Sequence, residues 1–291
     1  MSSNIRPDTT HWIKVLSGHR VFDVAVHEWS VENPSATAFC MHGFAGNSQD
    51  FALLATNLKK EGIATFAIDM PGRGSSAFLG DPQLYTMRLQ QLALEEAIAL
   101  THGPLFLVGT SWGGVILGAM APYLPRAISG LVLVDTPLVS QRQTVFPYED
   151  FLKDEAQAHF GTIHSARVYY AATRNLFHLP EDVLDQLLAA AVMTSGEGYR
   201  MRMDAALAGT IGRRSPFDIG KSIAKTKTPT LAVIGKNSYL YSAPEQVAAR
   251  SALPSLSEYI VEHEAHPPSL TQASQIEAIS TFMTGSIKPL A

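Results

Sequence analysis

The stretch Gly109-Thr110-Ser111-Trp112-Gly113-Gly114 follows the apolar run 105–108 and opens a segment with helical spacing. A G-x-S-x-G motif at a strand-to-helix junction makes a turn so tight that only small residues fit at its two ends. Such a turn holds its serine at a strained, exposed apex, at the helix end where the dipole favours negative charge. The motif therefore predicts that Ser111 is a nucleophile.

A second turn, Met41-His42-Gly43-Phe44-Ala45-Gly46, follows the apolar run 37–41. A glycine-rich turn at this point can aim a backbone N–H at a carbonyl oxygen held above the serine. We therefore expect the amides of Phe44 and Trp112 to form an oxyanion hole. His42 is interpreted as a hydrogen-bonding residue rather than a base, and it is counted among the substrate-binding candidates.

One of the ten histidines stands where a catalytic base is needed. His266 lies just past the last predicted strand and before the closing helix, so its loop can reach over the sheet edge to a serine. His263, in the same loop, is the competing candidate. Others, such as His27, lie in surface-like contexts.

Short apolar runs alternate with helical segments along the chain, and they predict the fold class. Near-continuous apolar strands separated by helices indicate parallel strands buried on both faces, in an α/β protein with right-handed crossovers. The expected strands span 22–29, 37–41, 63–68, 104–108, 131–134, 230–234 and 257–261, and the expected helices span 84–100, 115–123 and 269–283.

The stretch 138–225 breaks this alternation, because it contains no convincing strand. Helical patterns are expected instead over 149–160, 164–177 and 181–193. We predict that residues 138–225 form a helical cap. Residues 1–137 and 226–291 then make the two parts of one α/β core.

Composition excludes several classes of protein. With 46% hydrophobic and 16% charged residues, the 291-residue chain has ample material for a core. Cys40 is the single cysteine, which excludes a disulfide framework, and the scattered histidines show no metal-ligand spacing. A net charge of −4 gives no basic footprint for nucleic acid, and no apolar run is long enough for a membrane helix. We expect a cytoplasmic monomer or homodimer that acts on a small-molecule substrate without a cofactor or metal.

The order Ser111, acid, His266, together with the His42-Gly43 turn and the turn 69–76, resembles the α/β-hydrolase superfamily. The resemblance covers nearly the whole chain. It implies a mostly parallel central sheet with helices on both faces and a cap inserted after the sixth strand. Within the superfamily the chain is similar to small capped carbon–carbon hydrolases, carboxylesterases, lactonases and amidohydrolases. Arg73 lies in the turn 69–76 that is common in the family, so it is interpreted as structural.

The resemblance leaves the catalytic acid as the open question. Relatives usually place it after the seventh core strand, where this chain has Ser238, and the next carboxylate, Glu245, fits the charge of a helix start. Asp135, at the end of the run 131–134, is our hypothesis for the acid. A minority of the superfamily, including a group that cleaves an acylaminomethylene-succinate amide in vitamin B6 breakdown, carries its acid there. The alternative is a weakened Ser–His dyad with a structural Asp135.

Arginines are concentrated in the predicted cap, and they suggest a substrate class. Arg142 and Arg167 are the best candidates to clamp a carboxylate, because a guanidinium binds a carboxylate through two parallel hydrogen bonds. The alternative is a solvated helical face. Phe146 and Tyr148 are expected to line an apolar substrate pocket.

Together these patterns predict a cofactor-independent serine hydrolase. It would cleave an ester, amide, lactone or activated C–C bond of a small molecule, carboxylated or not, with Ser111 as nucleophile, His266 as base and Asp135 as acid. Two alternatives stay open. One is a hydrolase-fold binding protein or receptor with slow turnover, and the other is a lyase of the hydroxynitrile-lyase type that uses the same triad.

Overall fold

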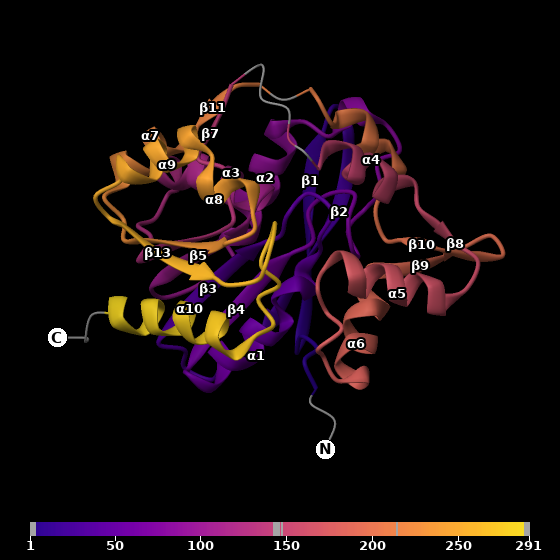
Figure 1. The fold of residues 1–291 in the computed structure, drawn as a ribbon, viewed down its shortest axis with the longest axis horizontal. Helices are drawn as coiled ribbons and strands as arrows, with labels where there is room; N and C mark the ends of the chain where they lie inside the picture. The colour runs from indigo at the N-terminus through magenta and orange to yellow at the C-terminus, as the bar shows by residue number, and fades with distance from the viewer. Residues whose placement is uncertain (1–3, 142–145, 147, 214, 288–291) are drawn as a thin grey trace.

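The computed structural model describes residues 4–141, 146, 148–213 and 215–287, and an eight-stranded sheet lies at its centre (Figure 1). The strands are, in spatial order, β1 (Thr9–Ser17), β2 (Arg20–Trp29), β4 (Ile63–Ile68), β3 (Ala36–Met41), β5 (Leu105–Thr110), β6 (Gly130–Val134), β12 (Thr230–Gly235) and β13 (Leu256–Val261). β2 runs antiparallel to β1 and β4, and all other neighbours are parallel. The prediction of a mostly parallel α/β sheet is confirmed.

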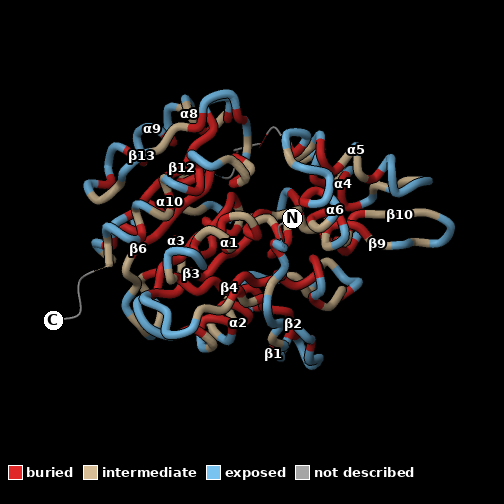
Figure 2. The backbone as a smooth tube through the Cα atoms, turned by 90° about the horizontal axis from the view of Figure 1, so that it is seen from below, coloured by how far each residue is buried: buried red, intermediate tan, exposed pale blue. Residues whose placement is uncertain are grey.

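The central strands are apolar throughout because helices cover both faces of the sheet. Every residue of β3, β4, β5, β6 and β12 is buried. Along β3, Ala38 and Cys40 join one apolar cluster, whereas Phe39 and Met41 join the other. Figure 2 shows this buried layer between partly exposed helices. The edge strand β1 was not predicted, because polar and apolar residues are mixed along it.

Helices cover the sheet on both of its faces. α1 (Ala52–Lys60) and α10 (Ala273–Ser286) lie on one face, and α2 (Met87–Ile98), α3 (Trp112–Met120) and α9 (Pro244–Ser251) lie on the other (Figure 1). Among the described residues, none of the helices combines the length and the apolar character that a bilayer crossing demands.

The segment between β6 and β12 contains the three predicted helices, α4 (Glu149–Gln157), α5 (Ile163–Thr173) and α6 (Glu181–Ala191). The expectation that it lacks strands is wrong, because the structure contains short strands here. They were missed because strands of two to four residues are too short to show an apolar pattern. They are β7 (Val139–Ser140), β8 (His159–Phe160), β9 (Val192–Ser195), β10 (Gly198–Met201) and β11 (Phe217–Asp218).

The last helix of this segment, α7 (Ile219–Thr226), packs against α3 of the core. The side chains of Ile219 and Ile223 lie so close to Gly118 on α3 that a methyl group there would touch both. The predicted cap boundary at residue 225 therefore included a helix that packs on the core. The elements that do not cover the central sheet are α4 to α6 and β8 to β10. They lie together at the right of Figure 1.

The junction of β5 and α3 has the tight geometry that its motif predicts. Ser111 has φ 48° and ψ −113°, a conformation that costs free energy for a residue with a side chain. A methyl group at Gly113 would overlap the backbone carbonyl of Met41, and one at Gly109 would overlap the backbone of Gly114. The helix can therefore start this close to the strands only because these positions carry no side chain.

The Gly113→Ala variant should lose at least about 3 kcal/mol of its free energy of unfolding, because the overlapped group is backbone and cannot turn aside. Gly285→Ala is the matched control. An added methyl there meets nothing within 4 Å, so helix propensity should raise the free energy of unfolding by up to about 1 kcal/mol. Urea denaturation measures both, and equal small effects would contradict the packing argument.

Candidate active site

Three predicted residues meet at the carboxyl-terminal edge of the sheet. Ser111 follows β5, Asp135 follows β6, and His266 lies in the loop after β13. Ser111 Oγ lies 3.0 Å from Nε2 of His266, and Nδ1 of His266 lies 2.8 Å from Oδ2 of Asp135. A carboxylate only accepts hydrogen bonds, so Nδ1 donates and Nε2 keeps its lone pair for the serine proton.

The competing residues do not occupy these places. His263 is exposed, and Glu245 lies in the first turn of α9, as its sequence context predicts. Ser238 caps α8 (Tyr239–Ser242) by accepting a hydrogen bond of 3.1 Å from the amide of Leu240. Asp135 is the carboxylate that the structure places on His266.

The backbone of Asp135 is as unusual as that of the serine. Asp135 has φ 45°, and its amide donates a 2.7 Å hydrogen bond to the carbonyl of Val233 on β12. The side chain is fully buried, and its Oδ1 has no hydrogen-bond partner among the described residues. His266 is therefore the side chain on which this buried carboxylate depends for a hydrogen bond.

The loop that carries His266 is anchored by a buried carboxylate that the sequence analysis did not single out. Glu264 accepts hydrogen bonds of 2.7 Å from the amide of Ser269, 2.7 Å from Gln272 and 2.8 Å from Gln275. These donors precede and begin α10, so Glu264 fixes the loop to that helix. The two glutamines, spaced three residues apart, were a weak signal for a shared acceptor.

The two expected oxyanion donors flank the serine. Trp112 is the first residue of α3, so its amide N–H has no acceptor within the helix and points out of the helix N-terminus. A methyl at Gly43 would lie 3.6 Å from Cβ of Ser111, so the loop after β3 passes directly over the nucleophile. Nδ1 of His42 donates to the carbonyl of Gly43 at 2.6 Å. In a trans peptide the following N–H points the opposite way, so this bond orients the amide of Phe44.

His42 itself does not face a substrate. Its Nε2 accepts a 3.0 Å hydrogen bond from the amide of Met70, and the side chain is fully buried. Burial, with a smaller effect from Arg73, lowers the pKa of His42 to about 4, so the ring stays neutral. Its place among the substrate-binding candidates was wrong, because backbone groups occupy both ring nitrogens.

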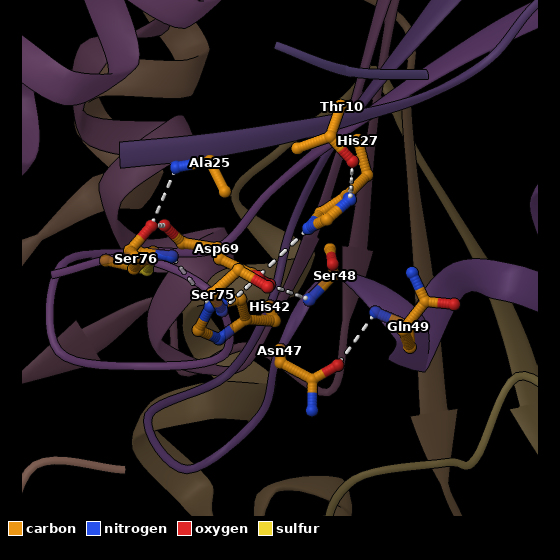
Figure 3. Close-up of polar contacts among 11 residues, drawn as sticks. Thr10, Ala25, His27, His42, Asn47, Ser48, Gln49, Asp69, Ser75 and Ser76 are labelled. Atoms are coloured by element: carbon orange, nitrogen blue, oxygen red, sulfur yellow. Dashed lines mark hydrogen bonds and ion pairs between the residues drawn. The ribbon is translucent and has the colours of Figure 1, made fainter. Parts of the chain in front are cut away.

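Asp69, directly after β4, connects the loop after β3, which carries Phe44, to the rest of the core (Figure 3). It accepts hydrogen bonds from Nε2 of His27 at 3.1 Å and from the amides of Ser48 and Ser75, each at 2.7 Å. Burial opposes its ionisation, but these donors outweigh burial and lower the pKa of Asp69. The expectation that His27 lies at the surface was wrong, because the side chain is buried and this hydrogen bond holds it inside.

Arg73 supports the same loop from the other side, which confirms its structural interpretation. The side chain is buried and donates to the carbonyls of Phe44 and Pro71, each at 2.8 Å. Its guanidinium also lies 4.9 Å from the centre of the Phe44 ring. Phe44, the expected oxyanion donor, is therefore held at its backbone and at its ring.

Residues 32–257 match the family described as serine aminopeptidase, S33. The chain belongs to this family of α/β hydrolases. It is 23% identical over 209 residues to monoacylglycerol lipase ABHD6 from Mus musculus, an alignment that covers 67% of this chain and 60% of the lipase. The chain spans between 22% and 60% of the length of the first curated relatives.

Solved structures show the same fold. A hydrolase from Rickettsia typhi, whose function is described as putative, superimposes with a TM-score of 0.78 at 19% identity, over 95% of this chain and 98% of that one. E-2-(acetamidomethylene)succinate hydrolase superimposes with a TM-score of 0.73 at 21% identity, over 95% of this chain and 100% of that one.

In this S33 hydrolase a cavity with about 150 Å³ of space for water-sized groups opens from Ser111 and His266. Its walls are largely apolar, and one end is polar. The apolar walls include Leu53, Tyr148, Phe151, Leu152, Tyr170, Leu176 and Leu187. The polar end holds Asp50, Glu155 and Arg174, with Nη2 of Arg174 bonded to Glu155 at 2.5 Å and to the carbonyl of Ala45 at 3.2 Å.

The substrate-binding candidates from the cap fall in different places. Tyr148 lines the cavity and stacks on the ring of His266, with 4.7 Å between centroids, whereas Phe146 lines a smaller cavity beside Ser111. Arg167 lines neither cavity, because it pairs with Asp185 at 3.1 Å on the neighbouring helix. Arg142 lies outside the described residues.

Among the described arginines of the predicted cap, Arg174 is the one that lines the cavity, and the sequence analysis did not separate it from the others. Its partner Glu155 lies on α4 whereas Arg174 follows α5, so no local spacing marks the pair. Its pKa is raised, because the nearby Glu155 carboxylate outweighs the effect of burial. Burial raises the pKa of Asp50 to about 6.

The buried neutral ring of His42 should make stability depend on pH. Between pH 6.5 and 4 the unfolded histidine binds a proton and the folded one does not, so the free energy of unfolding falls as pH falls. The loss attributable to His42 should reach about 3 kcal/mol. His42→Gln keeps one donor and one acceptor but does not titrate.

Urea denaturation of both proteins at pH 7 and pH 4 isolates this effect from other titrating groups. The stability advantage of the wild type over His42→Gln should shrink by about 3 kcal/mol at the lower pH. An advantage that is the same at both pH values would contradict a neutral buried His42.

Proposed function

We propose that this chain is a cofactor-independent serine hydrolase with Ser111 as nucleophile, His266 as base and Asp135 as acid. One observation carries the proposal: the unbroken line of hydrogen bonds from Ser111 Oγ through both ring nitrogens of His266 to Asp135, with lengths of 3.0 and 2.8 Å. A slow binding protein was the alternative because Ser238 stands where relatives carry the acid. The 2.8 Å contact between Asp135 and His266 supports an enzyme over that alternative.

In the first half-reaction, Nε2 of His266 takes the proton from Ser111 as Oγ attacks the substrate carbonyl. The amides of Phe44 and Trp112 stabilise the negative charge that develops on the carbonyl oxygen. Asp135 stabilises the imidazolium and keeps its Nδ1–H directed away from the serine.

The first half-reaction ends when His266 gives its proton to the leaving group, and an acyl group stays on Ser111. In the second half-reaction, water enters where the leaving group was, and His266 accepts a proton from it as its oxygen attacks the acyl carbon. The bond to Ser111 Oγ then breaks, His266 returns the proton to the serine, and the acid is released. The chain's own side chains, its backbone amides and water suffice for these steps.

The bond is proposed to be an ester, amide, lactone or activated C–C bond. Among the similar proteins, one is named a lipase and another a hydrolase of an acetamido compound, so ester and amide substrates both have precedents in this fold. The polar end of the cavity carries two carboxyl groups, Asp50 and Glu155, against one guanidinium, Arg174. That balance disfavours a carboxylate, so the preferred substrate is uncharged at this end. Cytoplasmic location and a monomeric or dimeric state stay predictions.

A serine-directed phosphonate should form a covalent adduct on Ser111, because the paired imidazole activates its oxygen. Mass spectrometry of the digested protein locates the adduct, and Ser111→Ala is the control that should carry none. A folded wild-type protein without an adduct would support a binding protein and contradict the proposed enzyme.

The Asp135→Asn variant should lower kcat at least about a hundredfold, because a carboxamide can hold His266 in the wrong tautomer. Ser238→Ala should leave kcat nearly unchanged and cost about 1 kcal/mol of stability, because it removes only a helix cap. Steady-state kinetics on an activated ester compares the two. Similar losses of kcat in both variants would contradict the assignment of Asp135.

A further inference from the structure

Ser111 lies where two cavities of very different size meet. The cavity described above, here called the large arm, is lined by His266. A second cavity, the small arm, opens on another side of the serine. Among the described residues, its lining consists of Phe44, Ser111, Trp112, Pro137, Phe146, Tyr148 and Phe217.

The small arm has room for about one water-sized group, so no alkyl group larger than methyl fits there without displacing its walls. The space open to water-sized groups is about 10 Å³ in the small arm and about 150 Å³ in the large arm. A single water needs roughly 10 to 15 Å³ by the same measure. A chain of several carbons therefore fits only in the large arm.

Four of the described residues that line the small arm are packed from behind, so these walls resist displacement. The indole N–H of Trp112 donates to Gln90 at 2.9 Å, and the guanidinium of Arg73 packs on the ring of Phe44. Tyr148 stacks on His266, and Phe146 is 3% exposed. Forcing extra carbons into such a packed site displaces fixed aromatic rings and costs binding free energy.

The position of the base decides which side of the substrate occupies which arm. The leaving group must receive its proton from Nε2 of His266, so it lies on the side of the imidazole. His266 lines the large arm and is not among the described residues that line the small arm. The leaving group therefore extends into the large arm, and the acyl group is left to the small arm.

We propose that this protein is a short-chain acyl hydrolase, which removes an acyl group of acetyl size from a larger alcohol or amine. The inference rests on the proposed function. The bond from Ser111 Oγ to the acyl carbon forms as the bond from that carbon to the leaving oxygen or nitrogen breaks, and the serine proton passes through His266 to the leaving atom. Water then replaces the serine, and the product is a short carboxylic acid.

Hexyl acetate and methyl heptanoate test the inference directly, because they are isomers that differ only in which side of the ester is short. We expect kcat/KM for hexyl acetate to exceed that for methyl heptanoate at least tenfold, a discrimination of the size that excluded carbons produce. In the activated series, kcat/KM for 4-nitrophenyl acetate should exceed that for 4-nitrophenyl hexanoate by a similar factor. Equal or reversed preferences overturn the inference.

The phosphonate adduct separates this inference from the proposed function. An adduct on Ser111 without the short-acyl preference overturns the inference alone. A folded protein that forms no adduct and cleaves none of the four esters overturns the proposed function. If neither alkyl ester is cleaved but the activated esters are, the acetate-to-hexanoate ratio decides.

Enlarging the small arm supplies the structural test. Phe217→Ala, on β11, should raise the ratio of kcat/KM for 4-nitrophenyl butyrate to that for the acetate about fivefold or more. Phe177→Ala makes the same change at an exposed cap position and should leave the ratio as it was. Phe217→Leu, a milder change, serves if the alanine variant does not fold. An unchanged ratio in the folded Phe217 variant overturns the inference.

Discussion

The rest of the site depends on one buried charge, the carboxylate of Asp69. A charge out of water must be paired and hydrogen-bonded, and Asp69 draws its donors from β2, from the loop after β3 and from the turn after β4. These three segments are far apart in the sequence. Their convergence fixes the loop of Phe44 beside the serine, so one carboxylate helps to place the Phe44 amide, whereas the start of α3 places that of Trp112.

Backbone strain occurs at both residues that meet His266. Ser111 and Asp135 both have positive φ, and both follow neighbouring strands. Each is held by its own amide, which donates to the next strand of the sheet at 2.8 Å for Ser111 and 2.7 Å for Asp135. A strained residue persists where its surroundings over-determine it, and here the sheet itself does so. The nucleophile and its acid thus inherit the rigidity of the central strands.

The sequence predicts what local patterns encode. Apolar runs were sufficient to predict the fold. The glycines of the G-x-S-x-G motif and the position of His266 after the last strand were sufficient to predict which residues meet at the strand ends. The Arg174–Glu155 pair, the anchor at Glu264 and the backbone role of His42 could not be predicted. Each depends on which faces of distant segments meet, and short polar strands such as β8 carry no periodic signal at all.

The position of the proposed acid after β6 has a consequence for how the chain can change. The proposed nucleophile, acid and oxyanion donors are all encoded before residue 138, and His266 alone among the proposed catalytic groups comes after the inserted segment. Mutation can lengthen, shorten or exchange the insert without changing the spacing between Asp135 and Ser111. The segment after β12 supplies no described carboxylate to His266, and here it contributes Tyr239, whose ring lies edge-on to the imidazole at 5.5 Å. The insert can therefore be exchanged, and with it part of the cavity lining, while the spacing of Ser111 and Asp135 stays in place.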